Sequence, residues 1–468
     1  RVDPPIGKES LYATQFKNLP IGQMEEKFAD YGEVQIKQLN DRSKMYYTPN
    51  KENNVFQLVV QYGAGEREFP KLGYAAQLMN NAGIMGAYEP QELKEELSKL
   101  NATCHVTADD DNLYIIMEGY EATLPQACQL LSRQILMPKL DEKQLARLKG
   151  SAMGMRQQRK DNVSILNEAL RQYMLYGEKS DYIKELTDKE IYELQISELT
   201  GDINRASNYE AKVFFTGTLP FDQVYDILSK NLPLVANERP SNSPQAKDMM
   251  PVTENTVYFL PNNDAEQAQI HLYIPMQKAD KKDDVLRSAF NQYFGLDFTG
   301  IVLNEIREKR SMAYTAYAFV GTQGIAGKAS YLRGYIGTQN DKANDALDVL
   351  MGLVNDMPKN PERIDNIKSY LRQAMLTSHP SFRNKAMELV DLGYRGYTDD
   401  PAKENLPKVD ALTFDDIVKF YEENIKDKPY CISIMGNPKN IDLKRLEKFG
   451  KVVKLNERKL FNTKDALF

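Results

Sequence analysis

The sequence predicts an α+β protein that contains two tandem homologous domains, each with helices packed against a sheet. Three observations lead to this prediction: the chain has 468 residues, its composition is typical of a folded protein, and a set of landmarks recurs at a nearly constant spacing. A chain of this length exceeds one ordinary hydrophobic core and favours two to four domains. We therefore expect two copies of roughly 215 residues each.

Two landmarks of the repeat are a strand and the amphipathic helix that follows it. The expected strands end at Gly119 in the first copy and at Gly337 in the second. The helices after them lead into Met-Pro pairs that contain Pro138 and Pro358. The two pairs of landmarks have nearly the same separation, and a recurrence of this kind is typical of internally repeated structures.

Two more landmarks follow at a similar separation. A Leu-Thr pair before a helix contains Thr200 in the first copy and Thr413 in the second. The next strands end at Gly217 and Gly436. Within each copy, strands are separated by helices and hairpins, which favours an α+β domain.

The expected boundaries follow from composition. Residues 19–235 form the first domain, residues 236–255 a linker, and residues 256–468 the second domain. The linker is rich in Pro, Ser and Asn and poor in apolar residues. Residues 1–18 are also Pro-rich and are expected to be an N-terminal linker. Because the chain begins with Arg1 and no targeting segment, we expect it to be one half of a longer array or a processed product.

Composition argues against several classes of function. The formal net charge of −6 provides no basic surface for nucleic acid, so no nucleic-acid partner is expected. No run of about 18 apolar residues occurs, so no membrane span is expected. The three cysteines, Cys104, Cys128 and Cys431, are widely spaced and fit neither a disulfide framework nor a thiolate zinc site.

The three histidines, His105, His271 and His379, do not form a metal-binding pattern. None occurs in an HExxH or HxxEH motif, so no helix presents two imidazoles on one face. His105 and Cys104 are neighbours on an expected strand and point to opposite faces, so they do not chelate one ion. The chain also lacks a GxSxG elbow and a complete phosphate-binding loop. We therefore expect no metal site within this chain and structural roles for the histidines.

The segment 302–317 is the strongest candidate for function. It is a short amphipathic helix that stops near Ser311 and leads into a strand from Ala313 to Phe319. Arg307 would lie late on the helix and Tyr314 early on the strand, where the pair could hold a peptide carbonyl or its oxyanion. Without further context, a solvated helix face and a half-buried strand tyrosine are the commoner interpretation.

The tandem copies and the segment Asn304–Tyr317 resemble the pitrilysin-like (insulinase) family of zinc metallopeptidases, over nearly the whole chain from about Asn18 to Leu455. The resemblance implies the fold of mitochondrial processing peptidase-like metallohydrolases, in which each domain has a mostly antiparallel sheet. It also implies a clam-shaped peptide chamber of two halves. One half carries HxxEH and a distal glutamate on zinc, and the other contributes an arginine and a tyrosine that hold the substrate.

The departures from the family pattern indicate which half this chain is. In the helix at residues 73–83, Ala76, Met79 and Asn80 occupy the positions of the two histidines and the general-base glutamate, and Gly154 aligns best with the distal glutamate. Zinc needs three protein donors, which these residues do not provide. The resemblance therefore implies degenerate zinc positions, no metal cofactor in this chain and no hydrolysis by it alone.

Other positions point the same way. His105 and Val106 stand where the family has a substrate-binding Asn-Ala, and the matching helix of the second copy, 284–295, also lacks ligands. By contrast, Arg307 and Tyr314 match the family's arginine and tyrosine with the family's spacing.

The resemblance implies the noncatalytic half of a zinc endopeptidase, which closes the chamber and completes the partner's site with Arg307 and Tyr314. The expected partners are a peptide substrate and a zinc-bearing catalytic half, from the same precursor or a separate subunit. The alternative is a structural or assembly subunit in which the pair merely ties a helix to a strand. An independent enzyme with a different metal site has little support. The sequence marks no compartment, although bacterial relatives of this design are often extracytoplasmic.

Overall fold

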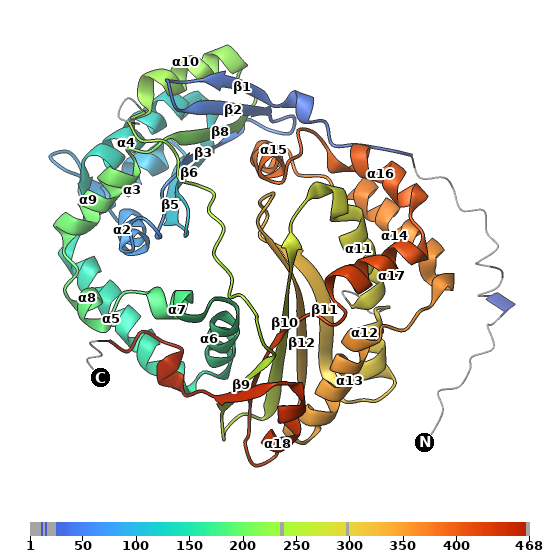
Figure 1. The fold of residues 1–468 in the computed structure, drawn as a ribbon. Helices are drawn as coiled ribbons and strands as arrows, with labels where there is room; N and C mark the ends of the chain where they lie inside the picture. Colours follow the sequence, from blue (N-terminus) through green and yellow to red (C-terminus); the bar gives the residue numbers. More distant parts are fainter. Residues whose placement is uncertain (1–10, 13–14, 16–24, 235–237, 296–298, 465–468) are drawn as a thin grey trace.

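The protein has an α+β fold with one six-stranded sheet in each half (Figure 1). The computed structural model describes residues 11–12, 15, 25–234, 238–295 and 299–464. The predicted linker at residues 1–18 lies almost entirely outside these ranges, and so does the predicted boundary at residues 235 and 236. The predicted fold class, two homologous α+β units in tandem, is confirmed.

The first sheet has the strand order β1-β2-β8-β3-β6-β5. Most of its neighbouring strands are antiparallel, and β2 and β8 are parallel. A separate two-stranded ribbon joins β4 (Gly83–Ile84) and β7 (Pro138–Lys139). The strands of the sheet are β1 (Gln35–Gln38), β2 (Lys44–Pro49), β3 (Val55–Tyr62), β5 (Thr103–Ala108), β6 (Leu113–Tyr120) and β8 (Ala211–Gly217).

The second sheet has the strand order β11-β12-β10-β13-β9-β14. Reading it backwards pairs β9 with β2, β13 with β8, β10 with β3, β12 with β6 and β11 with β5, so five strands repeat in order. The outermost strands differ, because β1 is antiparallel to β2 whereas β14 is parallel to β9. The strands are β9 (Thr256–Pro261), β10 (Gln267–Lys278), β11 (Ala313–Thr322), β12 (Ala329–Gln339), β13 (Cys431–Gly436) and β14 (Lys451–Lys454).

The helices of the first half begin at recognisable signals. Helices α3, α8 and α9 begin with capping boxes. In each, the N-cap side chain accepts a hydrogen bond from the third helical amide, and the glutamate at that third position accepts one from the N-cap amide. The bounds are α2 (Leu72–Met79), α3 (Pro90–Lys99), α4 (Leu124–Leu136), α5 (Glu142–Gln158), α6 (Val163–Tyr176), α7 (Asp181–Lys184), α8 (Asp188–Tyr192), α9 (Ile196–Ala206) and α10 (Phe221–Asn231).

The helices of the second half follow the same rules. Thr413 forms a capping box at α17, and Asp400 caps α16, which has Pro401 in its first turn. None of the described helices is long and apolar enough to cross a membrane. The bounds are α11 (Asp284–Phe294), α12 (Ile301–Leu303), α13 (Ala343–Asn355), α14 (Ile364–Thr377), α15 (Lys385–Tyr394), α16 (Pro401–Ala411), α17 (Phe414–Asn424) and α18 (Leu443–Leu446).

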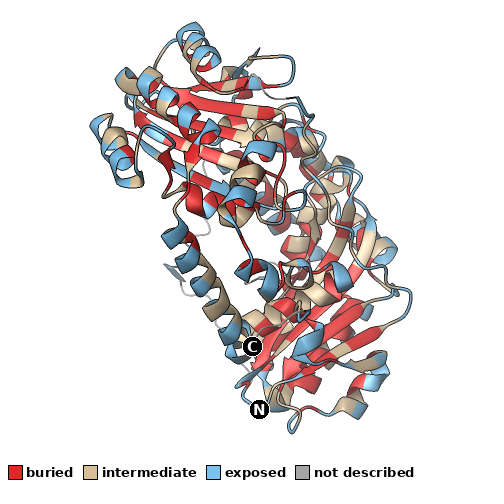
Figure 2. Ribbon diagram, turned by 90° about the vertical axis from the view of Figure 1, so that its left-hand side faces the viewer, coloured by how far each residue is buried: buried red, intermediate tan, exposed pale blue. Residues whose placement is uncertain are grey.

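Each sheet buries one face under helices of its own half. In β3, Leu58 and Val60 enter the core of the first half, and in β10, Ile270 and Leu272 enter the core of the second. Figure 2 shows the strands as largely buried and the outer helical surfaces as exposed. The alternation along each strand therefore sends every second residue to the opposite face, which needs its own cover.

A helix from the first half covers part of that opposite face in the second sheet. Leu166 and Leu170 of α6 pack with Leu260 and Met435 of β9 and β13 in one buried cluster. The end of α6 packs with Tyr273 of β10 in another. Figure 1 shows α6 beside the strands of the second sheet. The two halves are therefore joined by apolar packing as well as by the chain connection.

The second half makes the reciprocal contact, because its helix α15 packs against the first sheet. Ala386 of α15 packs with Val34, Val59 and Phe214 of the first half. Farther along, Leu392 packs with Tyr31. Each sheet is thus closed by a helix that the other half supplies.

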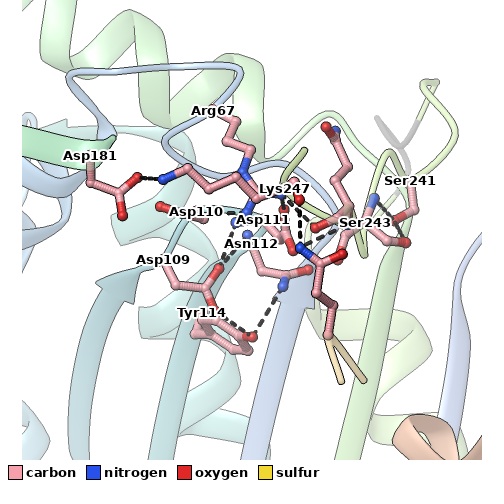
Figure 3. Close-up of polar contacts among 12 residues, drawn as sticks. Arg67, Asp109, Asp110, Asp111, Asn112, Tyr114, Asp181, Ser241, Ser243 and Lys247 are labelled. Atoms are coloured by element: carbon pink, nitrogen blue, oxygen red, sulfur yellow. Dashed lines mark hydrogen bonds and ion pairs between the residues drawn. The ribbon is translucent and has the colours of Figure 1, made fainter. Parts of the chain in front are cut away.

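Described residues of the predicted linker, among them Ser241, Gln245 and Lys247, make polar contacts with the first half (Figure 3). The guanidinium of Arg67 donates to the carbonyl of Gln245 and to Asp111, both at 2.7 Å. The Gln245 amide donates to Asp111 at 3.2 Å. Beyond it, Lys247 forms an ion pair with Asp181. These contacts fix the path of the chain between the two sheets.

The buried contact of α6 with the second sheet predicts a stability effect. Leu170 is fully buried there. We expect Leu170→Ala to lower the free energy of unfolding by about 2–5 kcal/mol, because it leaves a cavity between the halves. Urea unfolding followed by circular dichroism measures this change. In the control Leu136→Ala, where Leu136 is exposed, the change should stay within about 0.5 kcal/mol. Equal losses in both variants would contradict the prediction.

Candidate functional site

The helix predicted to carry degenerate zinc positions is α2, and two of its candidate residues are core residues. Ala76 and Met79 are each only 1% exposed and pack in the core of the first half. Gly154 lies on α5, where a Cβ atom would meet no heavy atom within 4 Å among the described residues. Together with Asn80, these side chains offer neither imidazole nor carboxylate. The residues present do not fit a zinc ion.

Asn80 fastens the end of α2 to β5, the edge strand of the first sheet. Its Nδ2 donates to the Val106 carbonyl at 2.9 Å, and its Oδ1 accepts from the Val106 amide at 2.8 Å. Nδ2 also lies 3.2 Å from the Ala76 carbonyl of its own helix. Because a strand at a sheet edge exposes unpaired amides and carbonyls, Asn80 satisfies both groups of Val106 at once.

The second copy repeats this contact. Asn291 of α11 donates to the Val320 carbonyl at 3.0 Å and accepts from the Val320 amide at 2.6 Å. Val320 lies on β11, the edge strand of the second sheet. The next outward amide of that strand, on Ala318, donates to the Gly295 carbonyl at 3.1 Å. We call the Asn80–Val106 and Asn291–Val320 contacts the asparagine clamps.

A cleft of about 520 Å³ opens beside the first clamp, between α2, α3 and β5. Cys104 of β5 lines it, whereas the neighbouring His105 is exposed. Burial raises the pKa of the Cys104 thiol to about 12, so the thiol stays protonated at neutral pH. Among the described residues, no cluster of three or more His, Cys, Asp or Glu side chains is placed to hold a metal.

The remaining histidines lie apart. His379 is exposed after α14, while His271 of β10 is 3% exposed and lies under α6. The His271 Nε2 atom lies 3.0 Å from Oδ1 of Asn167 on α6, which favours the tautomer that donates from Nε2. Burial, with the charges of Arg333 and Arg171, lowers the His271 pKa to about 3.

The structure brings Arg307 and Tyr314 together. Arg307 lies in a π-helical turn, Asn304–Glu308, that continues α12. Its Cζ atom lies 5.6 Å from the centre of the Tyr314 ring, within the range of a cation–π contact. Ser311 between them has φ of 50°, so the chain reverses there in a left-handed conformation. π-helical turns interrupt regular helices and are frequent at functional sites.

A β-bulge directs Tyr314 outward. In the pairing of β11 with β12, Ala313 is opposite Thr338 and Thr315 is opposite Gly337, so Tyr314 is the extra residue. Bulges re-aim a side chain in this way at sheet edges. Tyr314 is accordingly 77% exposed.

Arg307 is the least constrained cation of its segment. Glu305 pairs with both Lys309 and Arg310. Arg307 has a 3.5 Å contact with its exposed neighbour Glu308, and 39% of its side chain is exposed. An exposed guanidinium next to an exposed phenol can donate hydrogen bonds to one carbonyl oxygen or oxyanion.

Several features of the site have no signal in the sequence. The asparagine clamps join residues 26 or 29 positions apart in the chain. An asparagine at position 80 predicts that a metal ligand is missing, but it does not predict which residue the asparagine binds. The bulge at Tyr314 also depends on pairing with β12. The repeat was the one available pointer, because Asn80 and Asn291 occupy matching helices.

One family model matches part of the chain. Residues 207–371 match the family model described as the peptidase M16 inactive domain. No curated protein sequence is significantly similar to the chain. Over residues 207–371 this match confirms the predicted resemblance to the pitrilysin-like family.

Three solved structures share the fold. The peptidase M16 inactive domain from Pseudomonas fluorescens has a TM-score of 0.67 and 17% identity, over 87% of this chain and 99% of that chain. The ferredoxin protease FusC, solved with Arabidopsis ferredoxin, has a TM-score of 0.68 and 12% identity, over 90% and 47%. The periplasmic protease PqqL from Escherichia coli has a TM-score of 0.65 and 12% identity, over 91% and 50%. The chain thus spans about half of each of the latter two.

The asparagine clamps predict a loss of stability on truncation. In Asn80→Ala or Asn291→Ala, a buried valine keeps an amide and a carbonyl without their partner, so we expect each change to cost about 1–3 kcal/mol of unfolding free energy. Urea unfolding measures it. Gln77→Ala, at an exposed position of α2, is the control and should change stability by less than about 0.5 kcal/mol. An Asn80→Ala protein as stable as the control would refute the role of the clamp.

His271 predicts a pH dependence. Its folded pKa of about 3 lies below the ordinary 6.5, so protonation favours the unfolded chain. Stability from this residue is complete above pH 6.5 and falls by up to about 1.4 kcal/mol per pH unit toward pH 3. Urea unfolding between about pH 7 and pH 4 should show a shallower pH dependence for His271→Gln than for the parent chain. His379→Gln should keep the parent slope, and unchanged slopes in both would contradict the prediction.

Proposed function

Because residues 207–371 match the peptidase M16 inactive-domain family, we propose that this chain is the noncatalytic half of a pitrilysin-type zinc endopeptidase. It closes a peptide chamber whose other half carries the zinc. That other half is an upstream part of the same precursor or a separate subunit. The lengths of FusC and PqqL, each about twice the matched region, support this arrangement.

The observation that carries the proposal is the contact between Arg307 and Tyr314. Both side chains are exposed, so a peptide held by the partner half can reach them. As the scissile carbonyl gains negative charge, the guanidinium and the phenol donate hydrogen bonds to its oxygen or to the neighbouring backbone. Donors that act on developing charge in a closed site lower the barrier of the reaction.

The proposal assigns the zinc to the partner. Ala76, Met79 and Asn80 provide neither imidazole nor carboxylate donors for zinc, and Asn80 is already bound to Val106. The contribution of this chain is therefore to bind the peptide, to exclude water and to complete the site with Arg307 and Tyr314.

A purely structural role for the pair has less support. The turn that carries it is held by backbone bonds, from Met312 to Ile306 at 3.0 Å and from Ser311 to Arg307 at 2.8 Å. Thr338 also donates to the Met312 carbonyl. These bonds remain after Arg307 and Tyr314 lose their side chains. A purely structural role does not account for the exposure of both side chains.

Substitution of the pair tests the proposal. In the assembled peptidase, Arg307→Ala and Tyr314→Phe should each lower kcat/KM by about a hundred- to a thousandfold, because each removes a donor to the oxyanion. The unfolding free energy of the chain should stay within about 0.5 kcal/mol of the parent value. Steady-state cleavage of a fluorogenic peptide measures the first quantity.

Two matched controls accompany this test. Arg310→Ala removes a cation of the same segment with nearly the same side-chain exposure, 40% against 39%. Tyr192→Phe removes the hydroxyl of an exposed tyrosine on α8. Both should retain full activity. Undiminished cleavage by Arg307→Ala and Tyr314→Phe would favour the structural or assembly subunit instead.

A further inference from the structure

The face of the second sheet that is turned away from its core carries an ordered set of aromatic and cationic residues. The strand register places Arg333 of β12 between Phe319 of β11 and Tyr273 of β10. The adjacent row holds Tyr317, Tyr335 and His271 in the same order. Helix α6 covers the β10 side of these rows, where His271 and Tyr273 are buried. Arg333 and the residues of β11 stay partly exposed.

Arg333 lacks an acceptor among the described residues. No hydrogen bond or ion pair joins its guanidinium to them, and its Nε atom is buried without a partner. Buried polar groups are normally hydrogen-bonded, and an unpaired one points to an absent ion, water or ligand. A planar guanidinium binds a carboxylate through two parallel bonds.

The surroundings of Arg333 include a second arginine and a buried histidine. The nearby Arg171 of α6 already pairs with Glu168. Burial and the charges of both arginines lower the pKa of His271, so its ring is uncharged at neutral pH. Burial raises the pKa of the Tyr176 phenol, and the charges of Arg171 and Arg333 oppose that rise. The chain thus assembles two cations and provides a carboxylate for one of them.

The aromatic residues beside Arg333 form a continuous surface. The ring centres of Tyr317 and Tyr335 lie 5.3 Å apart, and those of Tyr317 and Phe319 lie 6.1 Å apart. Partly exposed aromatic side chains offer large apolar contact area at little cost in conformational entropy. An extended peptide laid across β11 and β12 would contact these rings next to the guanidinium.

We propose that Arg333, with the rings of Tyr317, Phe319 and Tyr335, forms a subsite that binds a carboxylate of the peptide substrate. This inference rests on the proposed peptide-binding function and adds a substrate class to it: peptides that present an acidic side chain or a free C-terminus next to an apolar segment. The free guanidinium carries the charge complementarity, and the rings hold the backbone nearby. The subsite lies farther along β11 and on β12, whereas Arg307 lies on the turn before β11 and Tyr314 near the start of that strand.

Binding of short peptides to the full chain tests the subsite. The chain contains no tryptophan, so the fluorescence anisotropy of a peptide tryptophan reports on the peptide alone. Four nonapeptides of otherwise identical sequence carry glutamate or glutamine in the centre and end in a carboxylate or an amide. The peptide with the matching carboxylate should bind about tenfold more tightly, as expected for a hydrogen bond to a charged group.

Substitution of Arg333 assigns the effect. Arg333→Gln should abolish the preference, and Arg333→Lys should keep part of it. Arg372→Gln, at an arginine of α14 that pairs with Glu26 and Asp410, should keep it fully. Arg333→Gln should not lower the melting temperature, because it breaks no hydrogen bond or ion pair with the described residues, whereas loss of a structural arginine would lower it.

The outcomes separate this inference from the proposed function. A preference for central glutamate identifies an acidic side chain as the ligand, and a preference for the free end identifies the C-terminus. Equal binding of all four peptides, no binding of any, or a preference that survives Arg333→Gln would overturn the subsite. None of these results alters the effect of Arg307→Ala on cleavage by the assembled peptidase, which decides the proposed function by itself.

Discussion

The rest of the structure depends on one reciprocal interaction, in which each half packs a helix against the sheet of the other half. A sheet whose strands alternate has two faces, and each half covers only one of them with its own helices. Helix α6 covers part of the second sheet through Leu166 and Leu170, and α15 covers part of the first through Ala386. Because both contacts are apolar and buried, separating the halves would expose both sheets to water. The relative position of the halves, and of the surfaces between them, follows from this packing.

Within each half, the asparagine clamps solve the problem of the sheet edge. The open edge of a sheet is a template for pairing with another chain. Asn80 and Asn291 use one side-chain amide each to satisfy both backbone groups of a valine on that edge. Each clamp thereby joins a helix to the edge strand of its own sheet.

The proposed functional groups, by contrast, are polar side chains with few or no partners among the described residues. Tyr314 is the extra residue of a β-bulge, Arg307 contacts its exposed neighbour Glu308 while Glu305 pairs with Lys309 and Arg310, and Arg333 has no acceptor among the described residues. In a chain whose other polar groups are largely paired, such residues are candidates for contact with a ligand. All three lie on strands β11 and β12 or on the turn that leads into β11.

The sequence by itself determined the tandem α+β organisation, the absence of zinc donors at Ala76, Met79, Asn80 and Gly154, and the spacing of Arg307 and Tyr314. These properties are local or periodic, so a linear reading captures them. Only the tertiary structure showed that α6 and α15 each pack against the sheet of the other half. It also decided that each clamp asparagine binds the backbone of a valine, and that Arg333 lies beside aromatic rings without a carboxylate partner. Such contacts join residues distant in the chain, and their existence depends on strand register and on which sheet face remains uncovered, which no local pattern encodes.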